Sequence, residues 1–223
     1  TWHGDPALAR LARARAAALR IALRRTFRDA TTNLLADRPG GRAESEHAQV
    51  LGLLGGLFPA REIPGALRVL ESDHRLRRCS FYFSHYLFEV FARHRRTAAF
   101  ARHLERWQVM VRQGLRTPLE APEPARSDCH GWGSHPLHHL AAHVAGIQPS
   151  SPGFRTVRIA PTAAGPWLDY TCTVPHPDGR VRLEFAPARG RAVVDLPPGL
   201  RGTFEWAGRA RPLRPGRQVV PLP

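Results

Sequence analysis

The sequence predicts a mixed α + β fold of two parts: helical hairpins that form part of an α/α toroid, followed by a C-terminal antiparallel β-sandwich. Three observations support this prediction. Apolar residues recur at helical spacing through the first two thirds of the 223 residues. The composition changes at QPSSPG, residues 148–153, where proline, serine and glycine interrupt the helical pattern. Beyond this point the period falls towards two, in short segments rich in valine, threonine and aromatic residues.

The helices follow from apolar periodicity and from residues that start or stop a helix. The first runs from Pro6 to about Ala36, where the segment RPGG ends it. The second follows Ser45, which suits an N-cap, and is closed by Pro59. The fifth helix, predicted over residues 97–114, stops at Gly114. The remaining helices are predicted over residues 63–74, 80–94 and 135–146.

The strands follow from alternation and from turn residues. The segment HPDG, residues 176–179, lies between two alternating segments and predicts a β-hairpin. Six strands within about 75 residues are typical of a β-sandwich. We therefore divide the chain at residues 1–147, part of a six-hairpin helical domain, and 148–223, a β-sandwich domain. The six strands are expected within residues 155–161, 168–174, 180–187, 191–197, 202–208 and 217–223.

The charge of the chain is strongly positive but evenly spread. All 33 basic residues are arginine, and with 18 acidic residues the net charge is +15. The arginines are scattered along the chain, whereas a phosphate-binding surface normally gathers basic residues into one patch. We interpret them as a solvated surface and expect no nucleic-acid partner. Polyanion binding is the alternative, and an association with DNA that does not depend on salt would exclude it.

Hydrophobicity and cysteine usage indicate the compartment. No run of 18 apolar residues occurs, so we expect no membrane partner. The first residues, TWHGDPALARLARAR, lack the apolar segment of a signal peptide. The three cysteines are far apart and contain no CxxC pair, which favours a reducing compartment over a disulfide framework. We therefore expect a cytoplasmic protein.

The segment Gly114–His139 is the first place to look for a site. A long loop without periodicity between helices is commonly functional or disordered, and its histidine, cysteine and tryptophan content argues against disorder. Glu120 lies beyond the helix end at Gly114, in a stretch that Pro122 and Pro124 should keep extended. A carboxylate in such a place can act as a general base. The competing interpretation is a solvated loop glutamate.

The histidines and aromatic residues of this region have two interpretations. A metal site would combine Asp128, Cys129 and His130 with histidines four residues apart; those histidines are His135, His139 and His143. The sequence contains no HExxH motif, and we favour histidines that line a polar pocket or the surface, without a metal or other cofactor. Aromatic rings beside polar groups can stack on sugar rings. Trp132, between two glycines, is the better candidate, since Trp107 in a periodic helix suits a core.

Four segments of the chain carry a recognisable pattern. They are SEHAQVLGLLGGL (45–57), YFSHYLFEVFARH (82–94), LERWQVMVRQGLRTPLEAPEPARSDCHGWGSHPLHHL (104–140) and GIQPSSPGFRTVRIAP (146–161). The third is the most specific, because it keeps the order W, GL, T, E, P, RSDCH, W and SHP. Together the segments resemble the C-terminal part of bacterial α-L-rhamnosidases of glycoside hydrolase family 78, and the similarity extends from about residue 30 to the end.

This resemblance implies an (α/α)6 barrel followed by a β-sandwich, and inverting hydrolysis of terminal α-L-rhamnosides. The base glutamate of the family falls at Glu120. Trp132 and His135 match the family's W-x-SH motif, whose side chains line the sugar subsite. Arg126, Asp128 and His130 match the family's RSDCH motif. These residues are expected to shape the loop or contact substrate. The remaining candidates, which match a helix start facing the barrel cavity, are Glu46 and His47.

The resemblance also implies what is missing. Family members place the general acid well upstream of the matched region, and no segment here matches that part. A complete toroid needs twelve helices, whereas about six or seven are predicted. The chain therefore resembles the C-terminal portion of a rhamnosidase, incomplete alone, whose partner would be the N-terminal portion of the same enzyme. The alternative is a remnant that binds carbohydrate or has a structural role, without catalysis.

Overall fold

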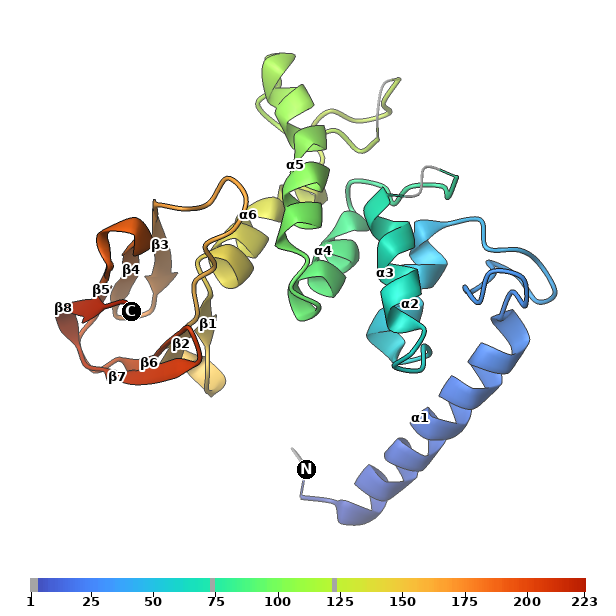
Figure 1. Cartoon of the computed structure of the whole chain (residues 1–223), viewed down its shortest axis with the longest axis horizontal. Helices are drawn as coiled ribbons and strands as arrows, with labels where there is room; N and C mark the ends of the chain where they lie inside the picture. Colours follow the sequence, from blue (N-terminus) through green and yellow to red (C-terminus); the bar gives the residue numbers. More distant parts are fainter. Residues whose placement is uncertain (1–3, 73–74, 122–123) are drawn as a thin grey trace. The chain divides into compact units, whose positions relative to one another are not determined.

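The structure is a computed structural model that describes residues 4–72, 75–121 and 124–223 (Figure 1). Within these residues it contains six α-helices and two four-stranded sheets, so the mixed α + β class predicted from the sequence is confirmed. The chain divides into two compact units, Thr1–Val90 and Phe91–Pro223. The first strand begins at Ile147, and the predicted division into domains between residues 147 and 148 stays a prediction.

The first helix, α1 (Pro6–Phe27), is fixed at its start by a side-chain cap. The carboxylate of Asp5 accepts hydrogen bonds from the backbone N–H groups of Ala7 at 2.9 Å and Leu8 at 3.0 Å. These two donors have no partner inside the helix, so the cap satisfies them. Pro6 suits the first turn because its nitrogen carries no hydrogen.

Helix α1 ends at Phe27, so the prediction that it reaches Ala36 is wrong. The carboxylate of Asp29 accepts a hydrogen bond from the N–H of Thr31 at 2.9 Å, and this bond is the largest of the influences that lower the pKa of Asp29. Asn33 adopts a positive φ of 60°. Asp and Asn side chains offer the backbone an alternative to helical hydrogen bonds, and here they form a turn that apolar periodicity does not reveal.

The next four helices lie in the predicted segments, although the helix expected over residues 80–94 begins only at Ser84. Ser45 caps α2 by accepting a hydrogen bond from the N–H of Ala48 at 3.4 Å, as expected. Gly56 ends α2 before Pro59, at a φ of 70°. Gly114, at a φ of 79°, follows the end of α5. The four helices are α2 (Glu46–Gly55), α3 (Ile63–Ser72), α4 (Ser84–Arg93) and α5 (Thr97–Arg112).

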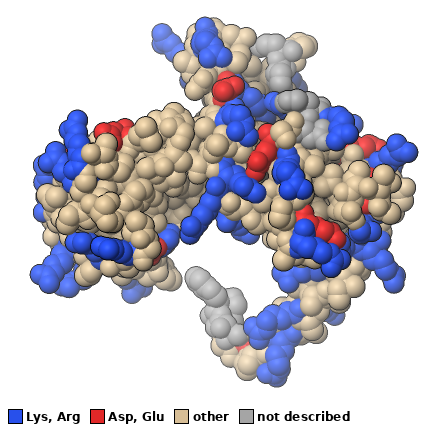
Figure 2. Space-filling model, in the orientation of Figure 1, with Lys and Arg blue, Asp and Glu red and all other residues tan. Residues whose placement is uncertain are grey.

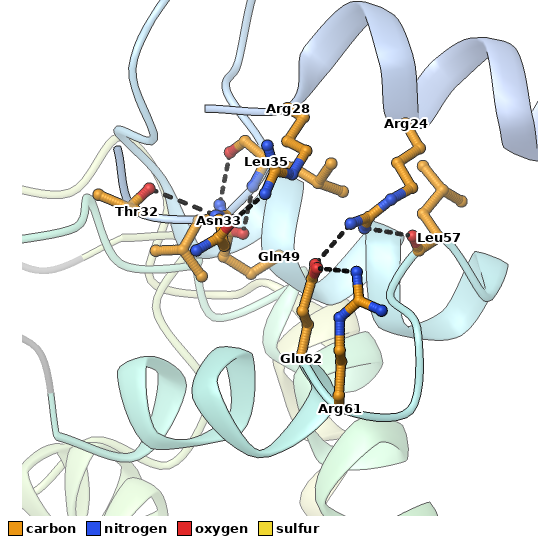
Figure 3. A network of polar contacts seen from close by, with 10 residues as sticks. Arg24, Arg28, Thr32, Asn33, Leu35, Gln49, Leu57, Arg61 and Glu62 are labelled. Atoms are coloured by element: carbon orange, nitrogen blue, oxygen red, sulfur yellow. Dashed lines mark hydrogen bonds and ion pairs between the residues drawn. The ribbon is translucent and has the colours of Figure 1, made fainter. Parts of the chain in front are cut away.

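Arginine side chains join α1 to the segment between α2 and α3 (Figure 3). Arg24 forms an ion pair with Glu62 at 2.6 Å and donates a hydrogen bond to the carbonyl oxygen of Leu57 at 3.0 Å. Earlier in the helix, Nε of Arg20 donates to the carbonyl oxygen of Gly55 at 2.8 Å. None of the residues of α1 is buried, and its exposed large apolar side chains are Leu8, Leu11, Leu19, Ile21 and Leu23.

Replacing Arg24 with leucine is expected to loosen α1 from the rest of the first unit by about 1–3 kcal/mol. The change removes the closest partner of Glu62, whose side chain is only 12% exposed. Hydrogen exchange at the amides of α1, followed by mass spectrometry, should become faster. The control is Arg13→Leu, which alters an exposed arginine of the same helix and should leave exchange unchanged. Equal exchange in both variants would show that the ion pair does not hold α1.

The last helical segment changes its hydrogen-bonding pattern midway. Helix α6 (Pro136–His139) continues directly into a π-helix, η2 (Leu140–Val144). The N–H of Ala145 bonds to the carbonyl oxygen of Leu140 at 2.8 Å, five residues back instead of four. The expectation of one regular helix over residues 135–146 is therefore wrong in its second half. Gly146, with a φ of 68°, ends the segment as predicted.

The strands form two four-stranded sheets. The hairpin predicted at residues 176–179 is confirmed, with His176 paired to Gly179. The expected wholly antiparallel arrangement is wrong for one pair, because β2 and β6 are parallel. The first sheet has the order β1 (Ile147–Pro149), β2 (Thr156–Ile159), β6 (Arg201–Trp206) and β7 (Arg209–Leu213). The second has the order β3 (Tyr170–His176), β4 (Gly179–Ala186), β5 (Arg191–Leu196) and β8 (Gly216–Pro221).

One buried cluster takes residues from both sheets. Val157 and Phe204 come from the first sheet, and Leu183 and Phe185 from the second. The rings of Phe185 and Trp206 meet edge to face, with centroids 4.9 Å apart. Residues of this cluster alternate along their strands with exposed ones, as in β4. Strand β5 is an exception, because Ala192, Val193 and Val194 are buried in succession.

The arginines are spread over the face shown in Figure 2. Their side chains occur over helices and strands alike, with acidic side chains between some of them. Ion pairs use a few, including Arg158 with Glu205 at 2.6 Å and Arg182 with Glu184 at 3.3 Å. Among the residues described, no helix combines the length and the hydrophobicity that a membrane crossing requires.

Candidate active site

The loop that follows α5 doubles back, and backbone hydrogen bonds hold its two arms together. The N–H of Glu120 donates to the carbonyl oxygen of Ser127 at 2.8 Å. The N–H of His130 donates to the carbonyl oxygen of Pro118, also at 2.8 Å. Leu119, between the two bonded positions of the first arm, is 3% exposed. The backbone that carries Glu120 is therefore fixed by hydrogen bonds and by one buried apolar side chain.

The carboxylate of Glu120 is paired with Arg126 from the opposite arm. Nε of Arg126 lies 2.9 Å from one carboxylate oxygen, and a terminal nitrogen of the same guanidinium contacts the other oxygen. This two-point geometry sets the orientation of the carboxylate as well as its position. The Glu120 side chain is 27% exposed and so remains open to solvent. Pro122, which was expected to keep this stretch extended, and Glu123 lie outside the described residues.

The second arm presents an exposed aromatic ring. Trp132 is 67% exposed, in a short 3-10 turn, η1 (Gly131–Ser134). Its ring meets that of His130 edge to face, with centroids 5.2 Å apart. Asp128 is exposed, and its carbonyl oxygen accepts a hydrogen bond from the hydroxyl of Thr117. An exposed indole beside polar side chains can stack on the C–H face of a sugar.

Trp107 of α5 fastens the second arm to the helix. Its indole N–H donates to the carbonyl oxygen of Gly133 at 2.7 Å, and its ring lies edge to face with that of His135 at 5.3 Å. Gly133 is buried, and a Cβ there would lie 2.6 Å from Cβ of Pro118. Sequence reasoning interpreted Trp107 as a core residue and missed this role. No sequence signal distinguishes a core tryptophan from one that fastens a loop, because a half-buried tryptophan has the same helical periodicity as a fully buried one.

The other two candidates, Glu46 and His47, belong to the first unit. Glu46 is 2% exposed, and its carboxylate accepts a hydrogen bond from the N–H of Cys79 at 2.7 Å. His47 packs against Phe83 with ring centroids 4.4 Å apart, and Phe83 packs against Tyr86 at 5.1 Å. Burial lowers the pKa of His47, although Glu46 acts in the opposite direction. The lowered pKa favours the uncharged form of His47, which can both donate and accept a hydrogen bond.

One interpretation of the sequence was a metal site that includes Asp128, Cys129 and His130. Within the described residues, the side chains close enough to share a metal ion do not include these three. Two of them, Asp128 and Cys129, are exposed on the loop. The histidines of α6 and η2 are the ones that lie close together. Asp128, Cys129 and His130 therefore do not share a site with His135, His139 and His143, whose rings follow one another at 5.4 and 5.3 Å.

No family model matches the sequence, and no curated protein matches it significantly. Several solved structures, in contrast, are similar to this chain. A family 78 rhamnosidase of Bacillus sp. GL1 is 19% identical, with a TM-score of 0.70 over 86% of this chain and 22% of its own. The α-L-rhamnosidase of Aspergillus terreus is 17% identical, with a TM-score of 0.67 over 80% of this chain and 24% of its own.

The α-L-rhamnosidase of Streptomyces avermitilis, solved with L-rhamnose, is similar as well. It is 19% identical, with a TM-score of 0.65 over 84% of this chain and 22% of its own. This chain therefore shares its fold with part of three α-L-rhamnosidases and spans less than a quarter of the length of each.

Proposed function

We propose that this chain is the C-terminal portion of an inverting, α-L-rhamnosidase-like glycoside hydrolase that cleaves terminal α-L-rhamnosides. The observation that carries the proposal is the loop of Glu120, whose carboxylate is held by Arg126 in a segment with the residue order of the family. The fold shared with the three rhamnosidases supports the same family.

Glu120 is the general base in this proposal. In an inverting glycosidase, a carboxylate takes a proton from the attacking water while an acid protonates the departing oxygen. Arg126 acts as a positioning residue. Its two contacts use two of the roughly four acceptor positions of a carboxylate, which leaves others for the water.

The neighbouring side chains form the proposed sugar subsite. Trp132 supplies an exposed ring for stacking, and His135, Asp128 and His130 supply polar groups for the hydroxyls of the sugar. Separately from this subsite, we propose that His47 of the first unit forms a second sugar-binding surface with Phe83 and Tyr86. Glu46, beside His47 in the sequence, accepts a hydrogen bond from the backbone of Cys79.

The acid is proposed to come from residues that precede this chain in the same enzyme. Inverting enzymes keep their two carboxyl groups roughly 6.5–9.5 Å apart, and the family resemblance places the acid upstream. The apolar side chains that α1 exposes fit this inference, because neighbouring helices bury such residues in an (α/α)6 barrel. The two sheets would form the β-sandwich that follows the barrel.

The isolated chain is expected to release little or no chromophore from a chromogenic α-L-rhamnoside, whereas the enzyme that includes the preceding region is expected to turn it over. In this proposal the acid and one wall of the barrel lie outside the isolated chain, and general acid catalysis alone contributes about 10²–10⁴-fold to rate. Initial rates at matched concentration measure the difference.

Two outcomes would contradict the proposal. Turnover by the isolated chain at the rate of the longer enzyme would show that the chain contains its own acid. Binding of rhamnose by the longer enzyme without turnover would instead favour a non-catalytic carbohydrate-binding protein.

A further inference from the structure

Three histidines gather where α6 passes into the π-helix η2. The ring centroids of His138 and His139 are 5.1 Å apart, those of His138 and His143 are 5.9 Å apart, and those of His139 and His143 are 5.3 Å apart. Each ring has a nitrogen within 4.8 Å of a nitrogen of the other two. All three residues belong to the second unit, so their arrangement is set by one short stretch of backbone.

The π-helix explains why His138 and His143 meet. Residues five apart lie on different faces of a regular α-helix, whereas hydrogen bonds that reach five residues back bring them to one side. The bond from the N–H of Ala145 to Leu140 marks this wider turn. A π-turn is less favourable than a continued α-helix and occurs frequently at functional sites. Here its effect is to bring His143 near His138, since His139 and His143, four residues apart, would meet in a regular helix as well.

The three side chains differ in burial in a way that suits a ligand from solvent. His139 is fully buried, His143 is half-buried and His138 is exposed. The side-chain amide of Gln148 lies 3.3 Å from Nδ1 of His143 and orients that ring. Metal-binding histidines are commonly held through their second ring nitrogen in this manner. The cluster therefore has a rigid inner ligand, an oriented second ligand and an outer ligand that solvent reaches.

We propose that His138, His139 and His143 bind a divalent transition metal ion, with zinc as the best fit. Imidazole nitrogen suits Zn²⁺, and three protein ligands leave the fourth tetrahedral position for water. Acidic groups alone would favour Mg²⁺ or Ca²⁺ instead, which prefer oxygen ligands. The proposal does not depend on the glycosidase function, because it concerns binding alone.

Isothermal titration of the full chain with ZnCl₂ tests the proposal. The chain is prepared without a histidine tag and stripped of metal with EDTA. We expect one zinc ion to bind per chain, and a single Co²⁺ ion to give visible absorption bands of a nitrogen-ligated site. His138→Ala and His143→Ala should each weaken zinc binding at least about tenfold, since loss of even an outer partner costs that much. His139 is left unchanged, because its burial ties it to folding.

His94→Ala is the matched control, since His94 is a half-buried histidine of the same unit. It should bind zinc as the parent does, and circular dichroism should show all three variants folded. The proposal is overturned if the parent does not bind zinc, or if His138→Ala and His143→Ala bind it as tightly as His94→Ala does.

Discussion

Replacing Glu120 with glutamine in the complete enzyme is expected to lower kcat for a chromogenic α-L-rhamnoside by about 100- to 10,000-fold, the range that a positioned general base contributes. Glutamine preserves the shape of the side chain and can still accept a hydrogen bond from Arg126, but it cannot take a proton from water. KM should change little, because in the proposed function other side chains of the subsite hold the sugar. Steady-state kinetics over a range of substrate concentrations separates the two quantities.

Glu184→Gln is the matched control for this experiment. Glu184 is also a partly exposed glutamate beside an arginine, at 3.3 Å from Arg182, and it lies on β4, away from the loop in sequence. The change should leave kcat unaltered, which would show that the loss in Glu120→Gln does not come from weakening an ion pair as such. If Glu120→Gln keeps the parent kcat, Glu120 is not the base. Glu120→Asp should be intermediate, because it keeps the carboxylate but withdraws it from the water.

Local signals predicted most elements of the fold, and the failures have identifiable causes. Capping by Ser45 and termination at Gly114 act within a few residues, so they can be recognised in the sequence. The end of α1 depends on side-chain hydrogen bonds of Asp29, which periodicity does not register. Strand β7 was missed because RARPL has little β-branched character and contains Pro212, which an edge strand tolerates.

Contacts between distant segments were beyond sequence reasoning. The parallel pairing of β2 with β6 joins residues about 45 apart and depends on how the chain crosses between sheets. In the site, the residue order of the loop predicted that Glu120 and Arg126 would belong together, but not that they would form a two-point ion pair. The histidine spacing predicted that His135, His139 and His143 share one face, and the ring centroid of His139 lies 5.4 Å from that of His135 and 5.3 Å from that of His143. The contact between His138 and His143 across the π-turn was not predicted.

Replacing Gly146 with alanine is expected to cause a large loss of stability in the second unit. Gly146 has a φ of 68°, where a side chain costs about 1–2 kcal/mol. A Cβ at this position would also overlap the carbonyl oxygen of Ala160 and lie 2.8 Å from its nitrogen. Backbone atoms cannot rotate away as a side chain can, so overpacking should add about 1–3 kcal/mol or more.

The backbone around Gly146 has little freedom to relax, because it is bonded on both sides. The carbonyl oxygen of Gly146 accepts the N–H of Ala160 at 3.0 Å, and that of Val144 accepts the N–H of Thr162 at 2.8 Å. The hydroxyl of Tyr170 also donates to the Val144 carbonyl at 2.9 Å. Moving either segment to admit a methyl group would break bonds that join η2 to the sheets. The strain should therefore appear as lost stability.

Gly208→Ala separates the clash from the backbone conformation. Gly208 has a similar φ of 74°, but a Cβ there would meet nothing within 4 Å. Urea denaturation of both variants should give a loss of about 1–2 kcal/mol for Gly208→Ala and a distinctly larger loss, or failure to fold, for Gly146→Ala. Equal losses would mean that only the positive φ matters at Gly146, and that the segment from Val144 to Gly146 can move away from Ala160. In that case the π-turn would not be fixed by its contacts with the sheets, and its hydrogen bonds alone would have to hold it.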